Sequence, residues 1–94
     1  MRLDLFMKWT GLYRQRTEAK RACDRGEVSV DGEPAKASSS VRPGTRILIE
    51  ASTRLVEAEV AEIPARAPSK SQRQRYVRLL RQERRDAVEA DLSF

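Results

Sequence analysis

The chain has 94 residues, 35% of them charged, and its formal net charge at pH 7 is +5. A single cysteine and the absence of histidine exclude an intramolecular disulfide and Cys-rich or His-rich zinc sites, so we expect no metal and no cofactor. No apolar stretch approaches the ~20 residues of a membrane-spanning helix, and the N-terminus does not resemble a secretory signal. These features predict a cytoplasmic protein with no membrane partner, and the basic excess favours nucleic acid as the partner.

Two short helices are expected in the first quarter of the chain. Between Arg2 and Leu12, apolar residues recur every three to four positions, which is the period of one buried helical face, and Gly11 ends this helix. From Arg14 to Arg25, small residues form a narrow stripe that allows close packing against another element. Gly26 is well placed as the C-terminal cap of this second helix.

A small antiparallel sheet should follow. Val28 and Val30 alternate with polar residues before Asp31-Gly32, a strong hairpin signal because both central positions of a type I′ turn need positive φ. After a second turn at Pro43-Gly44, residues 47–49 and 55–63 have the apolar content and alternation of two further strands. The expected fold class is therefore α+β.

The last third of the chain differs in composition. Pro64 and Pro68 interrupt regular structure, and from about Ser69 the residues are mainly Gln, Arg, Leu and Glu, which favour helix. We therefore predict a domain over residues 1–63, followed over residues 64–94 by a basic linker and a C-terminal helix of about five turns. Residues 64–94 contain eight bases and four acids. This segment is either a second RNA-facing element or a solvated helix.

Basic residues gather on the second helix and in one loop. At 100° per residue, Arg16 and Lys20 lie one turn apart beside the small-residue stripe, whereas Arg14, Arg21 and Arg25 share the far side. Lys36 and Arg42 flank an Ala-Ser-Ser-Ser loop whose short side chains suit phosphate oxygens. The alternative is a solvated helix and an ordinary polar loop.

An ordered set of these residues resembles a known family, the S4 RNA-binding domain of ribosomal small-subunit protein four. The matching positions run over residues 1 to about 50 and comprise Arg2-Leu3-Asp4, Phe6, Gly11-Leu12, Arg16-Thr17, Ala19-Lys20, Gly26, Val28-Ser29-Val30-Asp31-Gly32, Lys36-Ala37-Ser38-Ser39, Val41 and Pro43-Gly44. Among stand-alone members, the chain is similar to the small bacterial ribosome-associated group that includes heat-shock protein 15 and the S4 factor of ribosome-associated quality control. The segments Lys36–Ser39 and Val41–Gly44 favour the latter.

The resemblance implies the αL motif, in which two short helices pack on a small, mostly antiparallel sheet; here the predicted C-terminal helix would be added. It implies RNA contacts by the basic positions of the motif. With the basic residues that flank them, the predicted RNA-binding residues are Arg2, Arg14, Arg16, Lys20, Arg21, Lys36 and Arg42. Asp4 also matches, but an acid in the first turn of a helix is favoured by the helix dipole, so we expect it to cap the helix. Trp9 and Tyr13 could stack on RNA bases, but we expect them in the core.

The function implied by the resemblance is non-enzymatic RNA binding. The partners would be the large ribosomal subunit and its structured rRNA, with peptidyl-tRNA on split, stalled subunits, in ribosome rescue or quality control. The free protein is expected to be a monomer. Two alternatives remain: a protein-interaction module that docks through its C-terminal helix, and a detached targeting module of an RNA-modifying enzyme.

Overall fold

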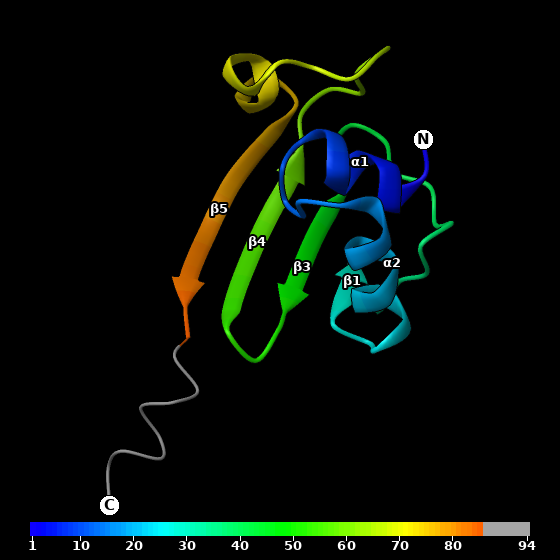
Figure 1. Cartoon of the computed structure of the whole chain (residues 1–94), viewed down its shortest axis with the longest axis vertical. Helices are drawn as coiled ribbons and strands as arrows, with labels where there is room; N and C mark the ends of the chain where they lie inside the picture. The colour runs from blue at the N-terminus through cyan, green and yellow to red at the C-terminus, as the bar shows by residue number, and fades with distance from the viewer. Residues whose placement is uncertain (86–94) are drawn as a thin grey trace, which may run out of the picture.

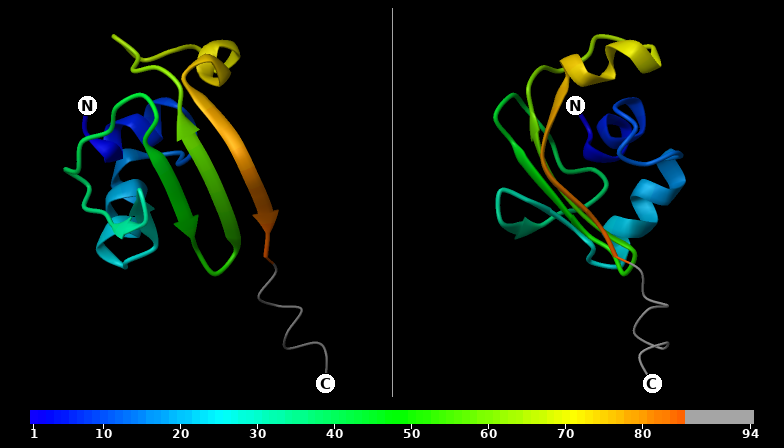
Figure 2. Two further views of the ribbon diagram at one scale, coloured as in Figure 1. Left: turned by 180° about the vertical axis from the view of Figure 1, so that it is seen from behind. Right: turned by 90° about the vertical axis from the view of Figure 1, so that its left-hand side faces the viewer.

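The computed structural model describes residues 1–85, which form two layers, with the helices on one face of an antiparallel sheet (Figures 1 and 2). The five strands are hydrogen-bonded in the order β2-β1-β3-β4-β5. The elements are α1 (Leu3–Trp9), α2 (Arg16–Asp24), β1 (Val28–Val30), β2 (Glu33–Pro34), β3 (Arg46–Glu50), β4 (Arg54–Val60), the 3₁₀ helix η1 (Lys70–Arg75) and β5 (Val77–Arg84). The predicted α+β class, with two short helices on a small antiparallel sheet, is confirmed. Within residues 1–85, every helix is too short or too polar to cross a membrane.

The helix α1 is anchored by the loop that follows β2. The backbone N–H of Leu3 donates to the Ser39 carbonyl at 2.7 Å, and that of Asp4 donates to the Ala37 carbonyl at 3.1 Å. Arg2 and Ser40 form an isolated antiparallel bridge. These bonds satisfy amides that a helix N-terminus leaves free, and they fix residues 37–40 beside α1. The helix is shorter than predicted because it ends at Trp9, before Gly11.

The second helix starts at Arg16, two residues later than predicted, and ends with the expected glycine cap. Gly26 has φ of 77°, and its N–H donates to the Cys23 carbonyl at 3.0 Å. The next N–H, of Glu27, donates to the Ala22 carbonyl at 2.9 Å. This pair of bonds is a Schellman motif, which turns the chain from the helix directly into β1.

The predicted hairpin and the two longer strands are also confirmed. Asp31 and Gly32 have φ of 51° and 86°, so both central residues of the β1–β2 turn are left-handed. The strands β3 and β4 pair in register, with Ile47 opposite Ala58 and Ile49 opposite Val56. Since alternate residues of a strand share one face, this register directs the apolar side chains of both strands toward the helices.

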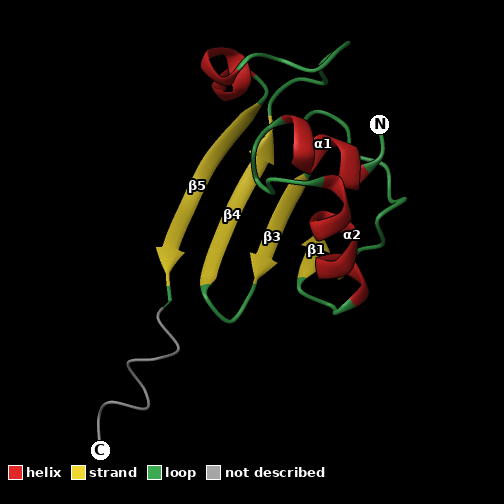
Figure 3. Cartoon of the chain, viewed as in Figure 1, coloured by secondary structure: helices red, strands yellow, loops and turns green. Residues whose placement is uncertain are grey.

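The predicted C-terminal helix is wrong for residues 77–84. Residues 70–75 form the short 3₁₀ helix η1, and Val77–Arg84 form β5, which pairs with β4 along its length (Figure 3). The helix-favouring composition is overridden because β5 supplies hydrogen bonds to an edge of β4 that is otherwise open and places Val77 in the core. Residues 86–94 of the predicted helix lie outside the described residues.

A β-bulge explains why the sequence pattern does not predict this strand. Glu57 pairs with Arg81 and the adjacent Ala58 pairs with Leu79, so Leu80 is an extra residue on β5. One extra residue breaks the two-residue alternation by which a strand is recognised. Leu79 and Leu80 are 51% and 40% exposed, which further blurs the apolar pattern.

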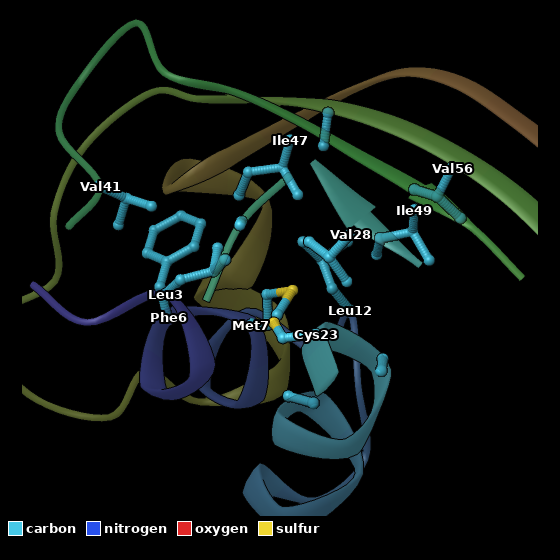
Figure 4. Close-up of a cluster of buried hydrophobic side chains, with 14 of the residues drawn as sticks. Leu3, Phe6, Met7, Leu12, Cys23, Val28, Val41, Ile47, Ile49 and Val56 are labelled. Atoms are coloured by element: carbon cyan, nitrogen blue, oxygen red, sulfur yellow. The ribbon is translucent and has the colours of Figure 1, made fainter. Parts of the chain in front are cut away.

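The core lies between the helices and the strands β1, β3 and β4 (Figure 4). Its largest fully buried side chains are Phe6, Leu3, Met7, Ile47, Ile49, Val28, Val56 and Val60. Ala19 and Ala22 are fully buried as well, and their small size lets α2 pack closely. Tyr13 packs against this cluster, and Trp9 is half-buried. The expected core position is thus confirmed for Tyr13 as a packing neighbour of the core, whereas Trp9 is not a member of the core cluster.

Candidate nucleic-acid interface

Asp4 is a buried carboxylate that holds two arginines in place. Its side chain is 4% exposed, and its Oδ2 accepts a hydrogen bond from Nε of Arg16 at 3.1 Å. Its Oδ1 accepts from Nε of Arg2 at 3.2 Å and from the backbone N–H of Leu5 at 2.8 Å. The arginine side chains remain 52% and 46% exposed for Arg2 and Arg16, respectively. Asp4 thus positions two cations that still face solvent.

The ionisation of Asp4 follows from these contacts. Burial by itself would raise the pKa of the carboxyl group, but the hydrogen bonds from Arg2, Arg16 and the Leu5 N–H outweigh it and hold the pKa below its ordinary value. Asp4 is therefore a carboxylate at neutral pH. The expected capping is confirmed in part: Asp4 accepts from the Leu5 N–H in the first turn, although the N-cap residue is Arg2. Pairing with Arg16, twelve residues away, adds a role that the sequence pattern did not indicate.

Other predicted RNA-binding residues lie beside this cluster. Lys20 is exposed one turn after Arg16 on the same flank of α2. Lys36 is exposed in the loop that runs along the N-terminus of α1, where its own N–H donates to Oγ of Ser39 at 2.9 Å. We call Arg2, Arg16, Lys20 and Lys36 the Arg16 surface. It presents four exposed cations from three segments of the chain.

The three remaining predicted residues lie elsewhere. Arg42 is exposed at the far end of the same loop, next to Val41, whose N–H donates to the Met1 carbonyl at 2.8 Å. Arg21 is exposed on the outer side of α2. Arg14 precedes α2 and borders a cleft on the flank opposite Arg16. The structure thus gathers four of the seven predicted residues. Arg42 lies at the other end of the loop, and Arg14 and Arg21 lie on other sides of α2.

A protein-family model matches the part of the chain that contains these residues. The family model described as S4 domain matches residues 1–47, half of the chain, and all seven predicted RNA-binding residues fall inside this match. The chain belongs to the S4 domain family. The Asp4 cluster, α2 and the loop over residues 36–42 are thus parts of its S4 domain.

Curated relatives carry one shared name. The chain is 43% identical over 63 residues to the "RQC P-site tRNA stabilizing factor" of Bacillus subtilis, covering 67% of this chain and 73% of the relative. It is 30% identical over 86 residues to the protein of the same name from Listeria innocua, covering 92% of both chains. The similarity to the Listeria protein extends beyond the S4 domain into the segment that holds η1 and β5.

A solved structure supports the fold. The trimeric structure of Vibrio cholerae heat shock protein 15 superimposes with a TM-score of 0.76 and 24% sequence identity, covering 84% of this chain and 80% of that one. The α+β fold over most of the chain is thus shared with a solved protein.

Three of the basic residues after the S4 domain pair with carboxylates of the protein. On the sheet face away from the helices, Arg78 pairs with Glu59 at 3.7 Å and Arg81 pairs with Glu83 at 3.0 Å. Arg75 pairs with Glu62 at 3.0 Å. These three arginines have nearby carboxylates that offset their charge, so this sheet face is less basic than the sequence indicates.

Cys23 contributes no reactive thiol to the S4 domain. It is buried among the core side chains, and burial, together with the charges of Asp4 and Asp24, raises the pKa of its thiol to about 11. The thiolate, which is the nucleophile and metal ligand, is therefore scarce at neutral pH. Within residues 1–85, no group of three or more acidic, histidine or cysteine side chains is placed to hold a metal ion.

The charge of Asp4 should make stability depend on pH. Because its pKa is lowered on folding, the carboxylate stabilises the fold above its ordinary pKa, and this contribution is lost as the pH falls through the folded-state value. We expect Asp4→Asn to reduce the free energy of unfolding by about 2 kcal/mol at pH 7. Urea denaturation at pH 7 and at successively lower pH should show the difference from wild type shrinking as the solution becomes acidic.

The matched control is Asp24→Asn, which removes an exposed carboxylate from α2. Its unfolding free energy should stay within about 0.5 kcal/mol of wild type. A constant difference between Asp4→Asn and wild type at every pH would mean that the carboxylate charge is not what stabilises the cluster.

Proposed function

We propose that this chain is a non-catalytic RNA-binding protein that binds structured rRNA of the large ribosomal subunit and stabilises peptidyl-tRNA on split, stalled subunits. The observation that carries the proposal is the pair Arg2 and Arg16, which are fixed by one buried carboxylate and exposed at the surface of an S4 domain. Lys20 and Lys36 extend the positive surface on either side. Fixed cations suit phosphate because little side-chain entropy is lost when they bind.

The form of this surface favours recognition by shape. Its cations come from a helix N-terminus, a helix flank and a loop, and they present charge and hydrogen-bond donors. A-form RNA hides base edges in a deep groove and exposes phosphates and 2′-hydroxyls, which such a surface can contact. The expected partner is therefore a folded RNA, with little preference for sequence.

The names of the relatives support the more specific part of the proposal. The words "P-site tRNA stabilizing factor" are attached to proteins that share up to 43% identity with this chain. We infer a corresponding role in ribosome-associated quality control, in which the chain would hold tRNA on a large subunit while the nascent chain is processed. The basic excess of the whole chain is consistent with such a partner.

Binding should weaken steeply with salt. If Arg2, Arg16, Lys20, Lys36 and Arg42 each neutralise one phosphate, the logarithm of the association constant should fall with the logarithm of salt concentration with a slope of about −4. Fluorescence anisotropy with a labelled rRNA hairpin between 50 and 300 mM KCl would measure the slope. A slope near zero would contradict an electrostatic interface.

Cosedimentation tests the ribosomal part of the proposal. The full chain is mixed with purified large subunits that are either vacant or loaded with P-site peptidyl-tRNA, and bound protein is measured in the pellet. We expect binding to both, and at least ~5-fold tighter binding to the loaded subunits, a coupling of about 1 kcal/mol. Equal binding would contradict tRNA stabilisation, and binding to neither would contradict the ribosomal partner.

A further inference from the structure

A second basic site lies on the flank of α2 opposite the Arg16 surface. There the loop between α1 and α2, the turn between β3 and β4, and η1 surround a cleft of about 690 Å³. The helix α2 borders the cleft through Glu18 on its far side and through Arg25, the residue that follows the helix. η1 lies outside the residues matched by the S4 family model, so this cleft combines the S4 domain with the segment that follows it.

The cleft has an excess of positive charge. Five cations, Arg14, Arg25, Arg54, Lys70 and Arg73, line it together with two carboxylates, those of Glu18 and Glu27. Glu27 is bound by Arg25 at 3.0 Å, which leaves one carboxylate facing four cations. Like charges that converge on one cleft repel one another, and a bound anion would relieve the repulsion.

Two of these arginines are held in place by neutral groups. Nη2 of Arg54 donates to the Leu12 carbonyl at 2.6 Å, and its guanidinium lies 4.7 Å from the ring centre of Tyr13. The guanidinium of Arg73 lies against Gly11, where a Cβ atom would come within 2.8 Å of Nη1. Their charges are thus fixed at the walls of the cleft without being neutralised there.

The same walls contain an unused hydrogen-bond donor. Within the described part of the chain, Nε of Arg73 is a buried donor without a hydrogen-bond partner, whereas the buried hydroxyl of Tyr13 has Arg54 as its neighbour; both residues line the cleft. A buried donor without a partner costs about 1 to 3 kcal/mol. An RNA phosphodiester is negatively charged and accepts hydrogen bonds, so a phosphate group in the cleft would balance the excess positive charge and accept bonds from the cationic side chains that line it.

We propose that this cleft binds a phosphate group of an RNA segment, as a contact separate from the Arg16 surface. That the phosphate group belongs to RNA rests on the proposed function. A free phosphate ion or a nucleotide would offer the same chemical group. Because the two sites occupy opposite flanks of α2, the chain would hold two RNA segments, or two parts of one folded RNA, on either side of one helix.

Titration with inorganic phosphate tests the cleft without any RNA. In ¹H–¹⁵N NMR spectra of the full chain at low salt, the backbone amides of Gly11, Ser52 and Thr53 are expected to shift in a saturable way. Lys70→Glu should abolish these shifts. The control Arg66→Glu makes the same charge change at an exposed residue of the same segment outside the cleft, and it should leave them unchanged. No saturable shift, or equal loss in both variants, would overturn the proposal.

RNA binding by the same two variants distinguishes the two sources of phosphate. We expect Lys70→Glu to weaken binding to the labelled rRNA hairpin by ~10-fold at 50 mM KCl and to make the salt slope shallower by about one unit. Arg66→Glu should weaken it less than ~3-fold. Phosphate shifts without any selective loss of RNA affinity in Lys70→Glu would overturn the assignment to RNA and identify a site for a free phosphate compound.

Failure of this inference can be separated from failure of the proposed function. If the chain binds RNA and Lys70→Glu and Arg66→Glu behave alike, the cleft is not an RNA contact but the Arg16 surface retains its role. If RNA binding is absent while phosphate still shifts Gly11 and Thr53, the anion site is supported and the RNA assignment is overturned.

Discussion

The double substitution Arg16→Gln with Lys20→Glu should weaken binding to large ribosomal subunits by ~30-fold to 100-fold, which corresponds to about 2 to 3 kcal/mol. The two side chains are exposed neighbours on one flank of α2. The change would remove two of the proposed phosphate contacts and introduce one repulsive charge. Glutamine is chosen at position 16 because a glutamate there would face the buried Asp4 carboxylate, whereas an amide can still donate to it. The affinity is measured by cosedimentation at 100 mM KCl.

The matched control for this experiment is Arg84→Gln with Arg66→Glu. It changes the net charge by the same amount at two exposed positions away from the Arg16 surface, so it should weaken binding less than ~3-fold. Circular dichroism of each variant should match wild type. If the control pair loses as much affinity as the test pair, only the overall charge matters and the Arg16 surface has no special role.

Truncation of Phe6 should have the largest effect on stability. This side chain is fully buried between α1 and the sheet, beside Leu3 and Val41 (Figure 4). Phe6→Ala removes its apolar contacts and leaves a cavity, which costs about 3 to 5 kcal/mol. For a domain of this size the thermal midpoint should fall by roughly 20 °C, as measured by circular dichroism.

The comparison variant is Leu79→Ala on β5, whose side chain is 51% exposed. It should reduce the free energy of unfolding by less than about 1 kcal/mol. Similar destabilisation by the two substitutions would indicate that α1 packs no more tightly than the edge strand, contrary to the burial of Phe6.

The parts of the fold that could be predicted are those set by local chemistry. Gly26 follows a helix as its cap, and Asp31-Gly32 can take the two positive φ values of a tight turn, so these boundaries can be read from neighbouring residues. The four strands β1 to β4 and the two helices follow from such signals together with apolar spacing. These elements form most of the S4 domain.

The strand β5 could not be predicted in this way because its stability is not local. Arg78, Gln82 and their neighbours favour helix as single residues, and the bulge at Leu80 disrupts the alternation. Only the open edge of β4 and the pocket for Val77 make the extended form favourable, and both exist only in the folded domain.

The residues of the candidate site could be predicted from the sequence, but the hydrogen bonds between them could not. The motif indicated Arg2, Arg16, Lys20 and Lys36, whereas the bonds from Asp4 to Arg2 and Arg16 depend on how α1 meets α2. The cleft could not be found from the sequence, because Lys70 and Arg73 reach it only after η1 packs against Gly11. The one sequence signal was Gly11 itself, which allows that close approach.

Sequencing of the RNA crosslinked to the full chain in living bacterial cells tests the central claim most directly. The wild-type chain and the Arg16→Gln, Lys20→Glu variant are compared at equal abundance. The proposed function predicts crosslinks concentrated in large-subunit rRNA and tRNA, and a loss of these crosslinks in the variant. Crosslinks scattered over unrelated RNAs, or the same pattern and yield from both proteins, would contradict the role of the Arg16 surface in binding ribosomal RNA.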